Sequence, residues 1–176
     1  GTLLASKLLG RMLLARGYDA KVSEVHGMSQ RGGSVVTYVR WGDHVYSPIV
    51  DRGEADYILS FELLEAARWT EYLRPDGILL TNTQKTNPMP VITGAMEYPA
   101  QLEEKLRALG LRLDAMDALT LAEQAGSPKA VNLVLLGRLS RYFDFTEDEW
   151  NTAIEQSVPP KFLELNKKAF ALGRGA

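Results

Sequence analysis

The chain of 176 residues contains no cysteine and only two histidines. Without cysteine it cannot form a disulfide, use a thiolate as a nucleophile or ligate an iron–sulfur cluster through its own thiolates. Two histidines are too few to predict a metal site unless carboxylates cluster with them. The absence of cysteine is compatible with a reducing compartment, and we expect a cytoplasmic location.

The sequence also lacks an excess of charge of either sign and a long apolar run. The formal net charge is −2 at pH 7, so the basic excess that is typical of a nucleic-acid-binding protein is absent. No stretch approaches the roughly 18 consecutive apolar residues of a membrane helix, and the sequence shows no charged, apolar and small-residue pattern typical of a signal peptide. We therefore expect neither nucleic acid nor a membrane among the partners.

What is present is ordinary globular composition, with 45% hydrophobic and 24% charged residues. That composition and length predict one folded domain over residues 1–176. Apolar residues recur at helical spacing from residue 3 to a stop signal at Gly17, and again in later segments. The predicted helices cover 61–73, 99–109, 118–125, 130–141, 146–156 and 161–172.

Short apolar and alternating segments predict strands between these helices. The predicted strands are 18–25, 34–41, 44–49, 55–60, 78–82 and 111–115. Pro75-Asp76-Gly77 predicts a turn, because proline presets φ and glycine tolerates positive φ, and 87–90 is expected to break regular structure. The pattern predicts a three-layer α/β fold: a mostly parallel sheet with an antiparallel ribbon, helices on both faces and a helical C-terminal tail.

The segment 26–34 between two predicted strands is unusual in its chemistry. It combines three glycines with His26, Gln30 and Arg31. Glycine permits close approach of a backbone or ligand, and the guanidinium suits carboxylate or phosphate. The segment is neither a phosphate loop nor a dinucleotide-binding motif. It either binds an anionic group or a partner, or it is a connecting loop with a solvated arginine. The candidate residues are His26, Gln30, Arg31, Gly32, Gly33 and Ser34.

Asn82 is a further candidate because it follows a predicted buried strand. In open α/β sheets, ligands bind beyond the carboxyl ends of strands, so a polar side chain there can face a ligand. The alternative is a strand-end cap. We identify no catalytic residue and no metal ligand in the sequence.

The segment 24–35, EVHGMSQRGGSV, resembles one found in the beta subunits of indolepyruvate ferredoxin oxidoreductases. These belong to the gamma-subunit family of pyruvate and other 2-oxoacid:ferredoxin oxidoreductases. The resemblance extends over essentially the whole chain. It includes Tyr46-Ser47-Pro48, Phe61-Glu62, Asn82-Thr83, Gly126-Ser127-Pro128-Lys129 and the tail at 158–166. Because such chains begin with a strand and a glycine-rich loop, we expect both to precede residue 1.

The resemblance implies an enzyme that oxidatively decarboxylates a 2-oxoacid, here an aryl pyruvate, to an acyl-coenzyme A. It implies a large alpha subunit that holds thiamine diphosphate, magnesium and iron–sulfur clusters and reduces ferredoxin. This chain would then bind none of these cofactors, would be inactive alone, and would use the loop at 26–34 and Asn82 toward the partner or coenzyme A. The alternatives are a stand-alone nucleotide- or anion-binding module and a structural scaffold subunit.

Overall fold

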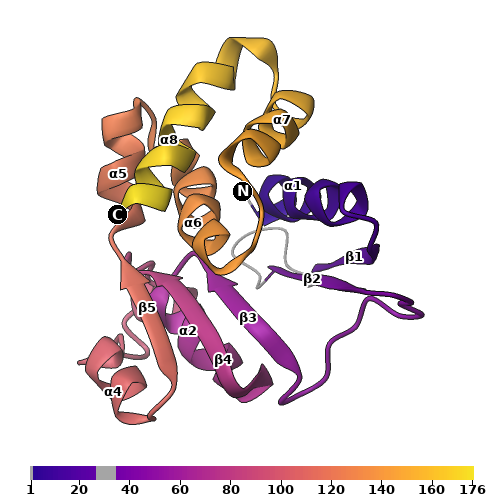
Figure 1. Ribbon diagram of the computed structural model, residues 1–176. Helices are drawn as coiled ribbons and strands as arrows, with labels where there is room; N and C mark the ends of the chain where they lie inside the picture. The colour runs from indigo at the N-terminus through magenta and orange to yellow at the C-terminus, as the bar shows by residue number, and fades with distance from the viewer. Residues whose placement is uncertain (1, 27–34) are drawn as a thin grey trace. The chain divides into compact units, whose positions relative to one another are not determined.

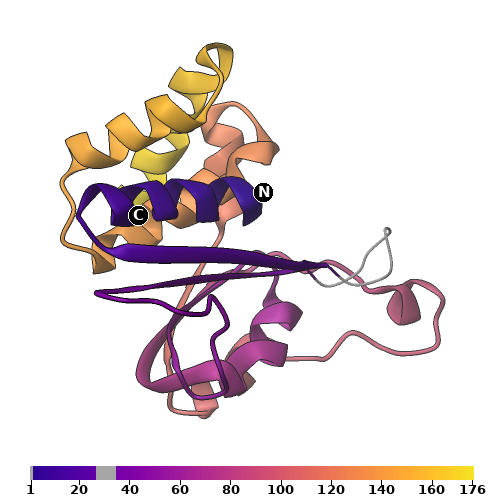
Figure 2. The ribbon, with the colours of Figure 1, turned by 90° about the vertical axis from the view of Figure 1, so that its right-hand side faces the viewer.

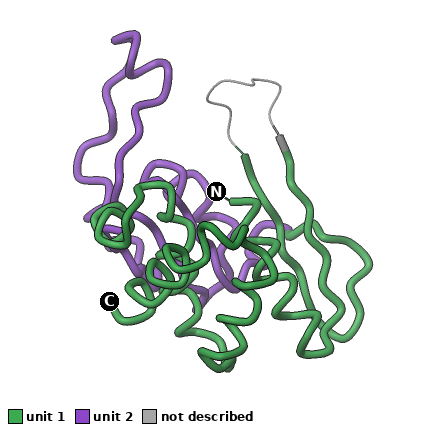
Figure 3. Tube along the Cα trace, turned by 90° about the horizontal axis from the view of Figure 1, so that it is seen from above, with its two compact units in different colours: residues 1–26, 35–50, 119–176 green, residues 27–34, 51–118 purple. Residues whose placement is uncertain are grey.

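The computed structural model describes residues 2–26 and 35–176. Two compact units account for them (Figure 3). The described part of unit 1 is 2–26, Val35–Val50 and Leu119–Ala176, and that of unit 2 is Asp51–Ala118. The expectation of a single domain over 1–176 stays a prediction, since compact units of this kind can belong to one domain.

Unit 1 begins with helix α1 (Thr2–Ala15) and an antiparallel ribbon of β1 (Asp19–His26) and β2 (Val35–Gly42). The buried stripe of α1 carries leucine and methionine side chains. Gly17, with a φ of 89°, ends the helix, and the backbone N–H of Tyr18 donates to the carbonyl of Leu13 at 3.1 Å. This is the left-handed glycine stop that the sequence predicted.

The predicted antiparallel ribbon is confirmed, but the third strand expected at 44–49 is wrong. Those residues form no regular strand. Val45 is buried, and its N–H donates to the Asp19 carboxylate at 2.8 Å. A side chain therefore takes the hydrogen bond that a neighbouring strand would have taken.

The other helices of unit 1 form the predicted helical C-terminal region. They are α5 (Ala118–Ala125), α6 (Val131–Leu139), α7 (Glu147–Ser157) and α8 (Leu163–Gly175), with 3-10 turns at Pro128–Ala130, Ser140–Tyr142 and Pro160–Phe162. Thr146 and Glu149 form a capping box that opens α7. It satisfies backbone N–H groups that a helix start leaves without partners.

Helices α6 and α8 cross with their backbones in direct contact at Gly137 and Gly173. A Cβ on Gly173 would overlap the carbonyl oxygen of Val134 and lie 2.9 Å from its Cα. A Cβ on Gly137 would overlap the carbonyl oxygen of Phe170. Glycine is therefore required at both positions by space rather than by backbone angle.

Unit 2 is built on a parallel sheet with the strand order β3-β4-β5 (Figure 1). Its elements are β3 (Ala55–Ser60), α2 (Leu63–Trp69), a 3-10 turn at Thr70–Tyr72, β4 (Leu73–Asn82), α3 (Met89–Ile92), α4 (Leu102–Ala108) and β5 (Arg112–Met116). Leu79 of β4 packs with Leu63 and Ala66 of α2 and with Leu102 and Leu106 of α4. The α/β class, the parallel sheet and the ribbon are therefore confirmed.

The turn predicted at Pro75-Asp76-Gly77 lies inside β4, where the pairing with β3 shifts register. Asp76, not Gly77, adopts the positive φ, at 66°. Gly77 is needed for space, because a Cβ there would lie 2.7 Å from Leu73 Cδ1 and 3.0 Å from the Ala55 carbonyl oxygen. The prediction was wrong because these residues form a strand irregularity instead of reversing the chain.

The break expected at 87–90 is also wrong in part, because α3 begins at Met89. Pro88 is its N-cap and Pro90 lies in its first turn. Proline is tolerated there, since the first N–H groups of a helix have no partner within it.

Candidate functional site

Of the seven residues predicted for a site, five lie outside the described residues: Gln30, Arg31, Gly32, Gly33 and Ser34. His26 is the last residue of β1 and pairs with Val35 of β2. Asn82 is the last residue of β4, and its side chain has hydrogen-bond partners in the structure. The site is therefore built from the carboxyl edge of the unit 2 sheet, where Asn82 stands.

The side chain of Asn82 is completely buried and joins the carboxyl ends of all three strands. Its Oδ1 accepts a hydrogen bond from the N–H of Ala118, after β5, at 3.1 Å. Its Nδ2 donates to the carbonyl of Phe61, after β3, and to Gln84 Oε1, both at 3.3 Å. Both N–H groups of the amide are thereby used. These contacts favour the strand-end cap, with Asn82 positioning the loops around it.

Backbone hydrogen bonds connect the same three loops. The N–H of Thr83 donates to the Met116 carbonyl at 2.9 Å, and the N–H of Leu63 donates to the Gln84 carbonyl at 3.2 Å. The side chains of Gln84, Lys85 and Thr86 are exposed on this edge. The edge is thus a fixed frame that presents polar groups, including one cation, at the place where α/β sheets bind ligands.

Glu62 is the residue of this edge that the sequence did not identify as part of a site. One carboxylate oxygen, Oε2, caps α2 by accepting from the N–H of Glu65 at 2.9 Å. The other, Oε1, accepts from the Tyr98 hydroxyl at 2.5 Å and the Thr86 N–H at 3.1 Å. Burial, followed by the hydrogen bond to Glu62, raises the pKa of the Tyr98 phenol. No local motif reveals this group, because Glu62 and Tyr98 are 36 positions apart.

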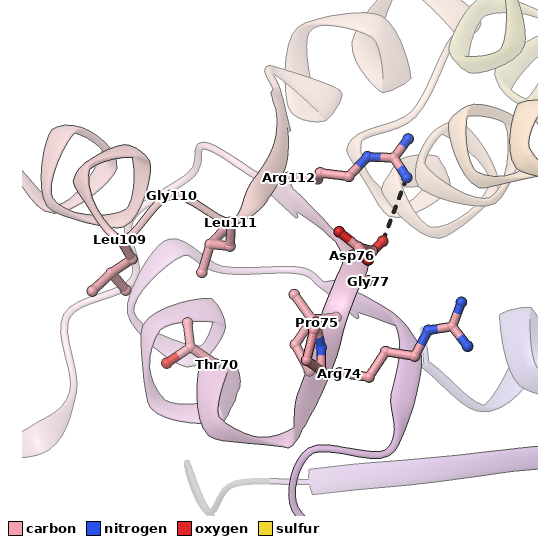
Figure 4. A pocket seen from close by; sticks show the side chains of 10 residues that line it. Thr70, Arg74, Pro75, Asp76, Gly77, Leu109, Gly110, Leu111 and Arg112 are labelled. Atoms are coloured by element: carbon pink, nitrogen blue, oxygen red, sulfur yellow. Dashed lines mark hydrogen bonds between the residues drawn. The ribbon is translucent and has the colours of Figure 1, made fainter.

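A second candidate is a shallow depression at the opposite, amino edge of the same sheet (Figure 4). Arg112 donates to the carbonyl of Asp76 at 3.4 Å, and Arg74 is paired with the Asp56 carboxylate at 2.7 Å. Ligands of open α/β sheets bind at the other edge, and both guanidinium groups already have partners. The depression is therefore the weaker candidate.

The donor set in the described part of the chain does not fit a metal centre. Residues 2–26 and 35–176 contain no group of three or more histidine, aspartate or glutamate side chains that could hold a metal ion. The sequence contains no cysteine for an iron–sulfur cluster. Within the same described ranges, the helices are too short or too polar to cross a membrane.

Comparison with known proteins identifies the family. The whole chain, residues 1–176, matches the family described as pyruvate ferredoxin/flavodoxin oxidoreductase. The chain is 44% identical over 178 residues to the indolepyruvate oxidoreductase subunit IorB of Thermococcus kodakarensis. That match covers 98% of this chain and 88% of the relative.

Solved structures share the fold. A subunit of pyruvate oxidoreductase from Thermotoga maritima superposes with a TM-score of 0.69 at 23% identity, over 97% of this chain and 86% of the other. The 2-oxoglutarate:ferredoxin oxidoreductase of Magnetococcus marinus gives 0.67 at 16% identity, over 98% of this chain but only 28% of that longer chain. By its full-length match and its close relative, this chain belongs to the pyruvate ferredoxin/flavodoxin oxidoreductase family.

Proposed function

We propose that this chain is the small subunit of a 2-oxoacid:ferredoxin oxidoreductase whose substrate is indolepyruvate or another aryl pyruvate. The observation that carries the proposal is the 44% identity to an indolepyruvate oxidoreductase subunit over 98% of the chain. The assembled enzyme would oxidatively decarboxylate the 2-oxoacid. Coenzyme A would take the acyl group, carbon dioxide would leave, and two electrons would pass to ferredoxin.

The cofactors of this reaction would be held by a large alpha subunit and not by this chain. Thiamine diphosphate with its magnesium ion would supply the carbanion chemistry, and iron–sulfur clusters would carry the electrons. The lack of cysteine in the sequence supports this division, because the clusters of ferredoxin-type proteins are ligated by thiolates. The same lack is compatible with the cytoplasmic location that we propose.

The role of this chain would be to present a fixed edge to the large subunit or to coenzyme A. Asn82 would act as a positioning residue, since its amide holds the loops after β3, β4 and β5 together. The residues proposed to face the partner or the ligand are His26, Gln30, Arg31, Gly32, Gly33 and Ser34. Among these, Arg31 has the chemistry to pair with a carboxylate or a phosphate.

The first experiment tests the requirement for both subunits. The large subunit is assayed with indolepyruvate, coenzyme A and an electron acceptor, with and without this chain. We expect acyl-coenzyme A formation only when both are present. Equal turnover by the large subunit alone would contradict the proposed function.

The same assay tests the loop with Arg31→Ala. Because hydrogen bonds to charged groups contribute about 1.5–3 kcal/mol, we expect a loss of roughly ten- to a hundredfold in subunit affinity or in kcat/KM. The matched control is Arg107→Ala, which removes an exposed arginine paired with Glu103 on α4. If Arg31→Ala changes neither assembly nor activity, the loop is a structural connection.

A further inference from the structure

Residues 87–97 form an arm between β4 and α4 that carries apolar side chains into solvent. Met89, Ile92 and Met96 are 60%, 65% and 64% exposed. None of them belongs to the core cluster of α2, β4 and α4. The arm can be followed in Figure 2 and, as part of unit 2, in Figure 3, where it runs out as a narrow loop. Packing of these three side chains therefore does not hold the arm in place.

Local hydrogen bonds give the arm its internal shape. The N–H groups of Val91 and Ile92 donate to the Pro88 carbonyl at 2.9 and 3.0 Å, and that of Met96 donates to the Pro90 carbonyl at 3.0 Å. A single helical turn is marginal in water without further support. The base of the arm offers such support through hydrogen bonds to Glu62.

At the base, one carboxylate oxygen connects both ends of the arm to helix α2. Glu62 Oε1 accepts from the Thr86 N–H, immediately before the arm, and from the Tyr98 hydroxyl, immediately after it. The second oxygen, Oε2, is occupied in capping α2. The Glu62 side chain is therefore fixed by the helix while it holds the two ends of the arm together.

Packing against the core positions the Tyr98 side chain for this contact. Its ring lies against the cluster that contains Leu63 and Leu79, and the Lys85 ammonium lies 5.8 Å from the ring centroid. Burial and then the Glu62 hydrogen bond raise the pKa of the phenol. The phenol is protonated at neutral pH in any case, and the raised pKa keeps it a donor in more alkaline solution as well.

We propose that Glu62 is a latch, and that residues 87–97 open and close as one unit while the β3-β4-β5 sheet stays folded. Opening breaks the two hydrogen bonds to Glu62 Oε1 and leaves the core cluster intact. Segments with few buried apolar contacts open at lower free energy than core strands do. Loss of the Glu62 contact would thus make the arm open more often without lowering the stability of the sheet.

Hydrogen exchange measured by mass spectrometry on the full chain tests this inference. In Tyr98→Phe and in Glu62→Gln, we expect the amides of residues 91–96 to exchange about tenfold faster or more than in the wild type. The basis is the loss or weakening of a hydrogen bond to a charged group. We expect the amides of residues 78–81 in β4 to change by less than about twofold, because they open only with the sheet.

The matched controls are Tyr72→Phe, which removes a hydroxyl from a residue whose ring contacts Trp69, and Glu103→Gln on α4. Both should leave the arm at its wild-type rate. Unchanged arm exchange in Tyr98→Phe would overturn the latch. If amide exchange in β4 accelerated as much as in the arm, the arm would not open independently of the sheet. If Glu62→Gln does not fold, Tyr98→Phe decides, since it removes a single oxygen atom and keeps the helix cap.

Discussion

The arm of unit 2 and the α6–α8 crossing of unit 1 are held by opposite means. At the crossing, Gly173 brings the α8 backbone against Val134 of α6, and no atom can be added between them. In the arm, the large side chains are exposed and two hydrogen bonds to Glu62 close the base. The helix crossing is stabilised by close packing of buried backbone. The arm is stabilised by hydrogen bonds to one carboxylate.

This difference predicts how each region responds to change. Close-packed interiors resist even one added methyl group, because neighbouring backbone cannot move without losing its own contacts. An exposed arm tolerates changes of volume and is sensitive only where its polar contact is lost. Small substitutions in each region therefore test whether packing holds the helix crossing and whether the Glu62 hydrogen bonds hold the arm.

The largest effect is expected for Gly173→Ala. The added Cβ would overlap the Val134 carbonyl oxygen, so the helices must separate, and overpacking of this kind costs about 1–3 kcal/mol, occasionally more. Urea denaturation should show a loss of at least about 2 kcal/mol in the free energy of unfolding. The control is Gly175→Ala in the same helix, where a Cβ would meet nothing within 4 Å. Equal stability of the two variants would show that the crossing is not close-packed.

Much of this fold could be predicted from local sequence signals. Gly17 and the Thr146–Glu149 capping box mark helix ends through neighbouring residues. Gly137 and Gly173 could not be interpreted in the same way, because the clash that requires glycine comes from another helix. The strand expected at 44–49 failed because the Asp19 side chain, distant in sequence, satisfies Val45.

The candidate site shows the same limit. Asn82 is predictable because its position after a strand is a local property, but its partners Phe61 and Ala118 follow the other two strands. Glu62 is not predictable as a site residue, because its role depends on Tyr98. Tyr98 is 36 positions away and follows the whole arm in the sequence. Local patterns predict elements well, and contacts between elements decide what a side chain does.

A smaller effect on stability is expected at the Arg16–Glu149 contact of unit 1. Like the Glu62 contact of the arm, it is polar, and it is exposed to solvent. The hydrogen bond from Arg16, followed by that from the Thr146 backbone, lowers the pKa of Glu149 from 4.5 to about 2. Because the pKa is lower in the folded state, this contact stabilises the protein above pH 4.5. The stabilisation is lost as the pH falls from 4.5 toward 2.

Melting temperatures measured between pH 7 and pH 2 test this. Glu149→Gln should lower the melting temperature slightly at pH 7 and should lose less than the wild type on acidification, because the substituted amide does not titrate. Solvent screening keeps the difference to a few degrees. Glu147→Gln in the same first turn of α7 is the control for the helix dipole. Parallel curves for the wild type and Glu149→Gln would refute the contribution of this carboxylate.

The smallest effect on stability is expected for Ile92→Ala in the arm. Ile92 is 65% exposed, and exposed substitutions usually change the free energy of unfolding by less than about 0.5 kcal/mol. The same substitution at the completely buried Ile154 of α7 should cost about 2–5 kcal/mol. Urea denaturation of both variants measures the contrast. A loss above about 1 kcal/mol for Ile92→Ala would exceed that exposed range. It would mean that the arm is held by its own apolar side chains. The arm and the helix crossing would then both be stabilised by packing, contrary to the contrast drawn between them.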